Sequence, residues 1–287
     1  MKTIFKKEFR SFFNNMSGYI FTAFMLLFGG IFTMALCLQQ SNGNFESVMG
    51  QMSILYIFAI PILTMRIISE DRRQKTDQLY YSMPISMTEV VLGKYLAMVA
   101  VLAVPLVVMA IHPIVLSNYG DLSLAVALGS IVAYFLLGAA LIAVGMFISA
   151  LTENVAISAV GTLLVILSNW FISSIADLVA VSSNVTLITV TVLAVIVSAI
   201  IWYMSKNGIA ALVVLALSEI TVIVLKIFAP ELISNFLPSL LKATSLFDRY
   251  YVFMSGVFDM TAVVFFVAVS FVFVYFTVQA MEKRRWS

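Results

Sequence analysis

Apolar runs separated by short polar turns dominate this chain, and their lengths predict eight membrane-spanning helices. A helix needs roughly 18 or more apolar residues to cross a bilayer, whereas the strands of a membrane barrel are shorter and alternate in polarity. The eight runs lie at about 18–38, 52–68, 93–116, 122–150, 155–176, 185–204, 208–229 and 260–281. For the two runs on either side of residues 205–208, the alternative is a re-entrant pair that enters the membrane without crossing it.

The positive charges between these runs predict the orientation of the chain. An even number of spans places both termini on the same side of the membrane, and cytoplasmic loops carry an excess of Lys and Arg. Of the 16 Lys and Arg residues, 13 fall on one face, while Lys226, Lys242 and Arg249 fall towards the other. We therefore expect a multi-pass protein of the cell (cytoplasmic) membrane with both termini in the cytoplasm.

Composition supports an all-α polytopic membrane protein. Hydrophobic residues make up 62% of the 287 residues and charged residues only 10%, against roughly 25% charged residues in a soluble domain. The single cysteine, Cys37, excludes an intramolecular disulfide and is expected only to pack. Because His112 is the single histidine, a two-histidine zinc-protease motif is excluded. Its position beside Pro113 in an expected span favours a packed or kink-associated role.

The first 16 residues form a separate amphipathic segment. Apolar residues recur there at helical spacing, and cations fill much of the remaining surface. A helix of this kind lies in the cytoplasmic interface, with its aromatic face towards the acyl chains and its cations near anionic headgroups. The alternative is a simple cytoplasmic extension whose charges only fix the topology. The residues are Phe5, Phe9, Phe12, Phe13 and Met16, and Lys2, Lys6, Lys7 and Arg10.

The charged segment 69–84 interrupts the apolar pattern between the second and third spans. Ser69 is a candidate N-cap, acids follow in the first turn, where they are favourable, and Pro84 ends the predicted helix. Ser86 and Glu89 then have the spacing of a capping box that starts the third span. We therefore expect a short helix of about twelve residues between the two spans.

The side chains of this segment offer a docking surface for a cytoplasmic partner. Charges of both signs come first, and aliphatic and aromatic residues that can contact a partner or the bilayer follow them. The alternative is a charged loop that is only solvated, which is the commoner role of such a run. The residues proposed to dock are Glu70, Asp71, Arg72, Arg73, Leu79 and Tyr80.

A single acid, Glu219, falls near the middle of the seventh expected span. A charge at such a depth costs about 3 kcal/mol or more, which makes an intramembrane acid a candidate functional residue by default. The alternatives are a protonated side chain and a hydrogen bond to a neighbour. Lys226 lies two turns further along a similar face, but the rise of about 10 Å makes direct pairing difficult.

Three stretches of the chain follow recognisable patterns. The stretch MRIISEDRRQKTDQLYYSMPISMTEVVLGKYLA, residues 65–97, contains an acidic-basic run, a short predicted helix, a proline and a Gly-Lys pair in that order. Residues 246–286, which begin LFDRYYVFMSG, form an aromatic outer segment, the last span and a basic tail, and ALTENVAISAVG, residues 150–161, falls at a cytoplasmic turn. In order and topology these stretches resemble the permease subunits of ABC-2 type ATP-binding cassette transporters, most closely those of gliding-associated and copper-processing type transporters.

The resemblance implies an ABC-2 permease fold that works as a homo- or heterodimer, each half bound to a cytoplasmic ATPase subunit. Residues 70–83 would be the coupling helix, which sits in a groove of the ATPase and transmits its closure. Because the family core usually has six spans, the resemblance marks 185–229 as an extra hairpin within a single transmembrane domain, 1–287.

The sequence contains no G-x-x-x-x-G-K-[ST] motif, and Gly93-Lys94 lacks the preceding glycine of a phosphate-binding loop. No cofactor or metal is therefore expected in this chain, and ATP and Mg would bind to the partner subunit.

The family resemblance and the absence of a nucleotide-binding motif together predict that this chain is the permease subunit of an ATP-driven exporter and is not itself an enzyme. Its expected partners are the ATPase, a second permease subunit and membrane lipid, with no nucleic acid. One alternative is a non-transporting scaffold or a mechanotransmitting subunit that acts on envelope proteins. A second alternative is a proton-coupled secondary transporter that uses Glu219, which predicts ATP-independent flux and an inverted repeat in the sequence.

Overall fold

The computed structural model describes residues 1–39, 44–77, 85–118, 122–180 and 238–285. Every regular element in these ranges is a helix, so the all-α prediction is confirmed there. The contacts divide the chain into two units, of which the first comprises Met1–Leu167 and Arg249–Ser287 and the second Ser168–Asp248.

Six helical stretches of the described ranges are long and apolar enough to cross a membrane, and they match six of the eight predicted spans. The other two predicted spans, with the hairpin 185–229, lie outside the described residues. The six stretches are Ser17–Leu38, Phe45–Arg73, Met87–Leu116, Leu124–Leu151, Val155–Leu178 and Met260–Arg284.

Several of the spans consist of more than one helical element. The chain begins with α1 (Lys2–Asn14), and α14 (Leu246–Tyr251) and η3 (Val252–Ser255) precede the last span. The spans are α2 (Ser17–Thr33) with the π-helix η1 (Met34–Leu38); α3 (Phe45–Met52), the 3-10 helix η2 (Ser53–Leu55), α4 (Tyr56–Thr64) and α5 (Ser69–Arg73); α7 (Met87–Met109) with α8 (Ile111–Leu116); α9 (Leu124–Leu151); α10 (Val155–Ala180); and α15 (Met260–Arg285).

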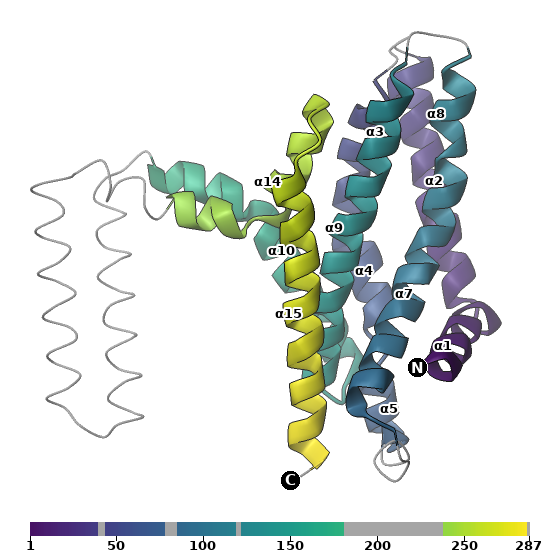
Figure 1. Cartoon of the computed structure of the whole chain (residues 1–287), viewed down its shortest axis with the longest axis vertical. Coiled ribbons are helices and arrows are strands. Elements are labelled where there is room, and N and C mark those ends of the chain that lie inside the picture. Colours follow the sequence, from purple (N-terminus) through teal and green to yellow (C-terminus); the bar gives the residue numbers. More distant parts are fainter. Residues whose placement is uncertain (40–43, 78–84, 119–121, 181–237, 286–287) are drawn as a thin grey trace, which may run out of the picture. The chain divides into compact units, whose positions relative to one another are not determined.

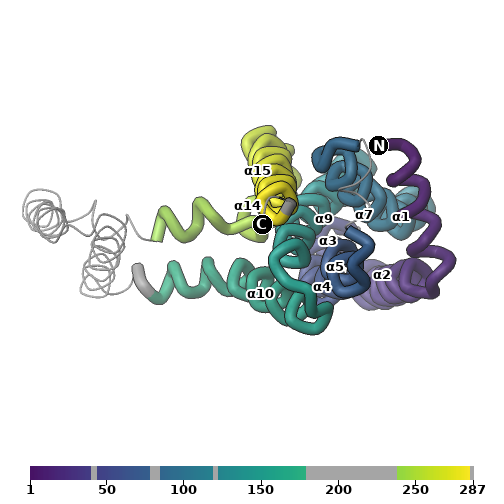
Figure 2. The backbone as a smooth tube through the Cα atoms, turned by 90° about the horizontal axis from the view of Figure 1, so that it is seen from below, coloured from purple at the N-terminus to yellow at the C-terminus, as the bar shows by residue number. Residues whose placement is uncertain are grey.

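Helix α9 lies at the centre of the first unit, between α4, α7 and α15 (Figures 1 and 2). The apolar window of α9 and that of the second span are each 72% buried, which makes these two the inner helices. A small residue permits the close packing, because a Cβ at Gly138 would lie 2.6 Å from both Tyr56 Oη and Leu102 Cδ2. Small residues at helix contacts let membrane helices approach closely.

Three fully buried tyrosines tie the second span to α9 and α14. Tyr56 Oη donates to the carbonyl of Tyr134 at 2.9 Å, and Tyr134 Oη donates to that of Met52 at 3.0 Å. Tyr250 Oη donates to the carbonyl of Met49 at 2.8 Å. Buried hydroxyls in a bilayer must find partners within the protein, so these bonds fix the part of the bundle away from α5.

Two residues that the sequence singled out are packed between helices. His112 lies in α8 just past the junction with α7, and its Nδ1 is 3.3 Å from the hydroxyl of Thr33. Cys37 is buried in η1. The packing that was predicted as one of two roles for His112, and the packing role predicted for Cys37, agree with these positions.

Candidate functional site

The charged segment begins with α5, the last helix of the second span, at the end of the first unit where α1 and the C-terminal end of α15 also lie (Figure 1). Its helix α5 is only five residues long, and Lys75 then adopts a left-handed conformation with φ 58°. A residue in this conformation commonly ends a helix. The prediction of one continuous helix of about twelve residues is therefore wrong, because the helix that begins at Ser69 ends at Arg73. Residues 78–84, in the second half of the predicted helix, lie outside the described ranges.

Ser69 does not cap this helix, contrary to the prediction. Ile68 occupies the N-cap position, and the Ser69 hydroxyl donates to the carbonyl of Met65, four residues back. The turn that joins α4 to α5 keeps this carbonyl within reach, so the hydroxyl bonds as it would in the interior of a helix.

Ser149 of α9 binds the start of α5 instead. Its Oγ accepts hydrogen bonds from the backbone N–H groups of Ile68 at 3.3 Å and Ser69 at 3.1 Å. Backbone N–H groups at the start of a helix need partners from outside that helix. The central helix of the unit therefore determines where the charged segment begins.

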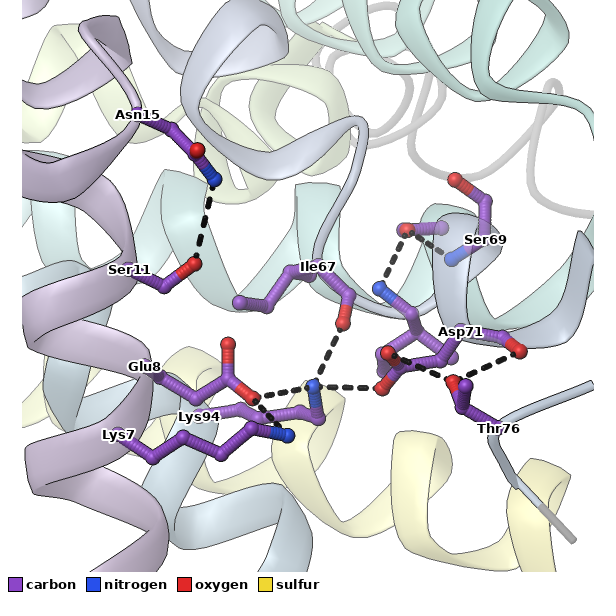
Figure 3. Close-up of polar contacts among 11 residues, drawn as sticks. Lys7, Glu8, Ser11, Asn15, Ile67, Ser69, Asp71, Thr76 and Lys94 are labelled. Carbon is purple, nitrogen blue, oxygen red and sulfur yellow. Dashed lines mark hydrogen bonds and ion pairs between the residues drawn. The ribbon is translucent and has the colours of Figure 1, made fainter. Parts of the chain in front are cut away.

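A buried ammonium group connects the charged segment with two other helices (Figure 3). Lys94 of α7 is 1% exposed, and its Nζ lies 2.7 Å from Asp71 Oδ2 and 3.0 Å from Glu8 Oε1. The same Nζ donates to the carbonyl of Ile67 at 2.9 Å. These three acceptors match the three N–H groups of a lysine. We call Lys94, Glu8 and Asp71 the charge cluster; it joins α7, α1 and α5.

The two carboxylates of the charge cluster are held differently. Asp71 is 24% exposed, and its Oδ1 accepts a hydrogen bond from Thr76 Oγ1 at 3.2 Å. Glu8 is 12% exposed, and the exposed Lys7 lies 3.9 Å away. A buried lysine is tolerated only with charged or hydrogen-bonding partners, so each of the three helices depends on the others for its charge balance.

Close backbone packing places Glu8 beside Lys94. Ile4, one turn before Glu8, packs against Gly93, where a Cβ would lie 3.0 Å from Ile4 Cγ2. The Gly-Lys pair at the start of the third span thus has two structural roles, since the glycine admits α1 and the lysine binds it. The predicted N-cap of this span is confirmed, because the N–H of Glu89 donates to Ser86 Oγ at 3.3 Å.

A second ion pair lies on the turn between α9 and α10. Glu153 accepts a hydrogen bond from Arg284 of α15. This bond and the charge of Arg284 lower the pKa of the Glu153 carboxyl, with smaller contributions from the charges of Arg72 and Lys75. Two separate parts of the chain, the charged segment and the end of α15, therefore act electrostatically on one carboxylate of the α9–α10 turn.

The predicted docking residues have different environments. Asp71 belongs to the charge cluster, and Arg72 is buried. The Glu70 carboxylate accepts a hydrogen bond from the Gln74 side chain at 3.2 Å and lies 3.9 Å from the Arg73 guanidinium. Both contacts of Glu70 therefore stay within the charged segment. Leu79, Tyr80 and Glu219 lie outside the described residues.

Sequence reasoning missed Glu8 and Lys94 as partners of Asp71. A signal for Glu8 was present, because it is the only acid among the first 16 residues. Lys94 stands at the start of a long apolar run, where a lone charge has to find a partner. Among the described ranges, no group of three or more His, Cys, Asp or Glu side chains could hold a metal ion.

One comparison with known proteins gives a match. The sequence model of the family described as "ABC-2 family transporter protein" matches residues 30–184, just over half of the chain. The matched range includes Asp71, Lys94, Ser149 and Glu153. No curated protein and no solved structure matches the chain significantly.

Proposed function

The chain belongs to the ABC-2 family of transporter proteins, and from this premise we propose that it is the permease subunit of an ATP-driven exporter. A separate cytoplasmic ATPase subunit would bind and hydrolyse ATP with Mg. The observation that carries the proposal is the 2.7 Å contact between Asp71 of the charged segment and Lys94 of the third span.

This contact provides a route from a docked ATPase to the membrane. A partner that moves α5 moves Asp71, and through Lys94 the force reaches α7, a helix of 23 residues. Ser149 links the same segment to α9 through the N–H groups of Ile68 and Ser69. Packed helices pass on displacements as rigid elements, so α5 is well placed to couple nucleotide hydrolysis to the spans.

The surroundings of the Gly-Lys pair support the assignment of ATP to a partner. A phosphate-binding lysine has to reach its ligand from a glycine-rich loop. Lys94 is instead 1% exposed and bonded to two carboxylates of its own chain. We therefore propose that this chain contributes no nucleotide-binding residue and that its part in the reaction is mechanical.

We further propose a multi-pass protein of the cytoplasmic membrane with both termini in the cytoplasm. The excess of cations on one face supports this orientation, as does the position of α1 and the end of α15 at the same end of the first unit (Figure 1). A dimer with a second permease subunit follows the family premise. The gliding-associated and copper-processing branch is proposed on the resemblance of residues 65–97 and 246–286.

Co-expression with the candidate ATPase tests the proposal. The wild type and the control Lys283→Gln, an exposed cation of α15 outside the charged segment, are expected to co-purify with the ATPase and to stimulate its hydrolysis in proteoliposomes. Asp71→Asn is expected to retain binding and lose the stimulation. A wild-type chain that captures no ATPase would overturn the proposal. ATPase capture without transport of any tested lipid, peptide or drug would replace the exporter with a mechanotransmitting subunit.

A further inference from the structure

The surface of α1 carries three different rows of side chains, each repeating every four residues. Ile4 and Glu8 form the docking row, which is buried against α7. The basic row is exposed, and the aromatic row is half-buried. The basic row consists of Lys2, Lys6 and Arg10, and the aromatic row consists of Phe5, Phe9 and Phe13.

The aromatic row is continuous. The Phe5 and Phe9 rings stack with centroids 6.0 Å apart, and the Phe9 and Phe13 rings follow at 5.1 Å. Tyr19 at the start of α2 extends the row, with its ring 5.3 Å from that of Phe13. A strip of rings thus leads from α1 onto the first membrane span.

Helical geometry places the basic row next to this strip. An α-helix turns about 100° per residue, so the aromatic row, which starts at Phe5, lies about 100° round the helix from the docking row, which starts at Ile4. The basic row starts at Lys2, three positions before Phe5, and therefore lies about 60° beyond the aromatic row. The cations are spaced about 6 Å apart along the helix. Because α1 lies at the edge of the first unit, beside α7 and α2 (Figure 2), the basic row points away from the bundle.

We propose that the basic row binds the headgroups of anionic phospholipids, and that this binding regulates coupling through Glu8. The regulatory part rests on the function proposed above. Each Lys or Arg close to an anionic surface strengthens binding about fivefold, so three cations give about a hundredfold preference over a neutral surface. A lipid-bound α1 holds Glu8 against Lys94, and Lys94 is the group that Asp71 of the charged segment also binds.

The neighbouring aromatic row favours lipid over an acidic protein surface as the partner. An acidic protein would neutralise the cations but would leave the strip of rings beside them in water. At a bilayer the two rows match successive layers, headgroups for the cations and the acyl boundary for the rings. The strip also continues into a membrane span through Tyr19, which places α1 at that boundary.

Photoactivatable phosphatidylglycerol and phosphatidylcholine in nanodiscs test the binding directly. Phosphatidylglycerol is expected to label residues 1–16 of the wild type at least about tenfold more than phosphatidylcholine. The variant Lys2→Gln/Lys6→Gln/Arg10→Gln should lose this preference. Of two matched single variants, Lys6→Gln should reduce the preference and Lys283→Gln, an exposed cation at the end of α15, should not. Equal labelling by the two lipids, or an unchanged preference in the triple variant, would overturn the proposal.

Hydrolysis by the complex with its ATPase tests the regulation. The wild-type rate is expected to rise with the fraction of phosphatidylglycerol, while Glu8→Gln should keep the labelling preference and lose the response. A wild-type rate that ignores the lipid would refute the regulation, and loss of ATPase capture by the triple variant in detergent would assign the basic row to a protein partner. The labelling needs no ATPase, so it remains decisive even if the proposed permease function is wrong.

Discussion

Lys94→Met removes the positive charge of the charge cluster and should destabilise the first unit strongly. The contacts of 2.7 and 3.0 Å correspond to about 5–6 kcal/mol each before desolvation, at an effective dielectric constant of about 20. Without the ammonium group the two carboxylate oxygens, at most about 6 Å apart through Nζ, repel by about 3 kcal/mol. Desolvation offsets much of the attraction, and loss of one member of a buried ion pair costs about 3–5 kcal/mol in total.

Cys37 provides the assay. It is the only cysteine and is buried, so a thiol-reactive dye reports unfolding during heating. The variant should unfold at a temperature lower by about 6 °C or more, given about 2–4 °C per kcal/mol for a domain of this size. The exposed Lys7 lies 3.9 Å from Glu8 and moderates the loss towards the lower end of the range.

A neutral version of the charge cluster is the control. Lys94→Met combined with Glu8→Gln and Asp71→Asn leaves no uncompensated charge, so it should recover about 2 kcal/mol relative to Lys94→Met alone. If Lys94→Met unfolds at the wild-type temperature, or if the triple variant is as unstable as the single one, the charges are not buried together and the reasoning fails.

Three further predictions concern packing, the start of α5 and pH. Gly138→Ala should lower the free energy of unfolding by about 1–3 kcal/mol, because the new methyl group meets Tyr56 Oη at 2.6 Å. The control is Gly30→Ala, where no atom lies within 4 Å of the new Cβ. This control should be neutral or slightly stabilising in the dye assay. Ser149→Ala should lower the free energy of unfolding by about 1–3 kcal/mol, because the backbone N–H groups of Ile68 and Ser69 lose their acceptor. Hydrogen exchange at these two amides should become faster, and protection equal to that of the wild type would contradict the prediction. The lowered pKa of Glu153 means that its contribution to stability is present above pH 4.5 and is lost as pH falls through the folded-state pKa; Glu153→Gln should therefore show a smaller drop in melting temperature between pH 7 and pH 4 than wild type.

The amino-acid sequence alone was enough to place the described spans. A run of apolar residues long enough to cross a bilayer has few alternatives to a helix, because every backbone polar group in lipid must be bonded within the segment. The Ser86 cap was also predictable, since its hydrogen bond joins residues three apart. The same local reasoning failed at Ser69, where the preceding turn and Ser149 from another helix override the capping preference.

Only the tertiary structure decided what the charged residues bind. Asp71 looked like one of several surface charges on a docking helix, yet it shares a buried ammonium group with a carboxylate 63 positions earlier in the chain, Glu8. Hydropathy fixes which segments enter the membrane because burial in lipid depends on each segment by itself. Ion pairing depends on which helices become neighbours, and that follows from contacts such as Ile4 against Gly93, which no local pattern in the sequence encodes.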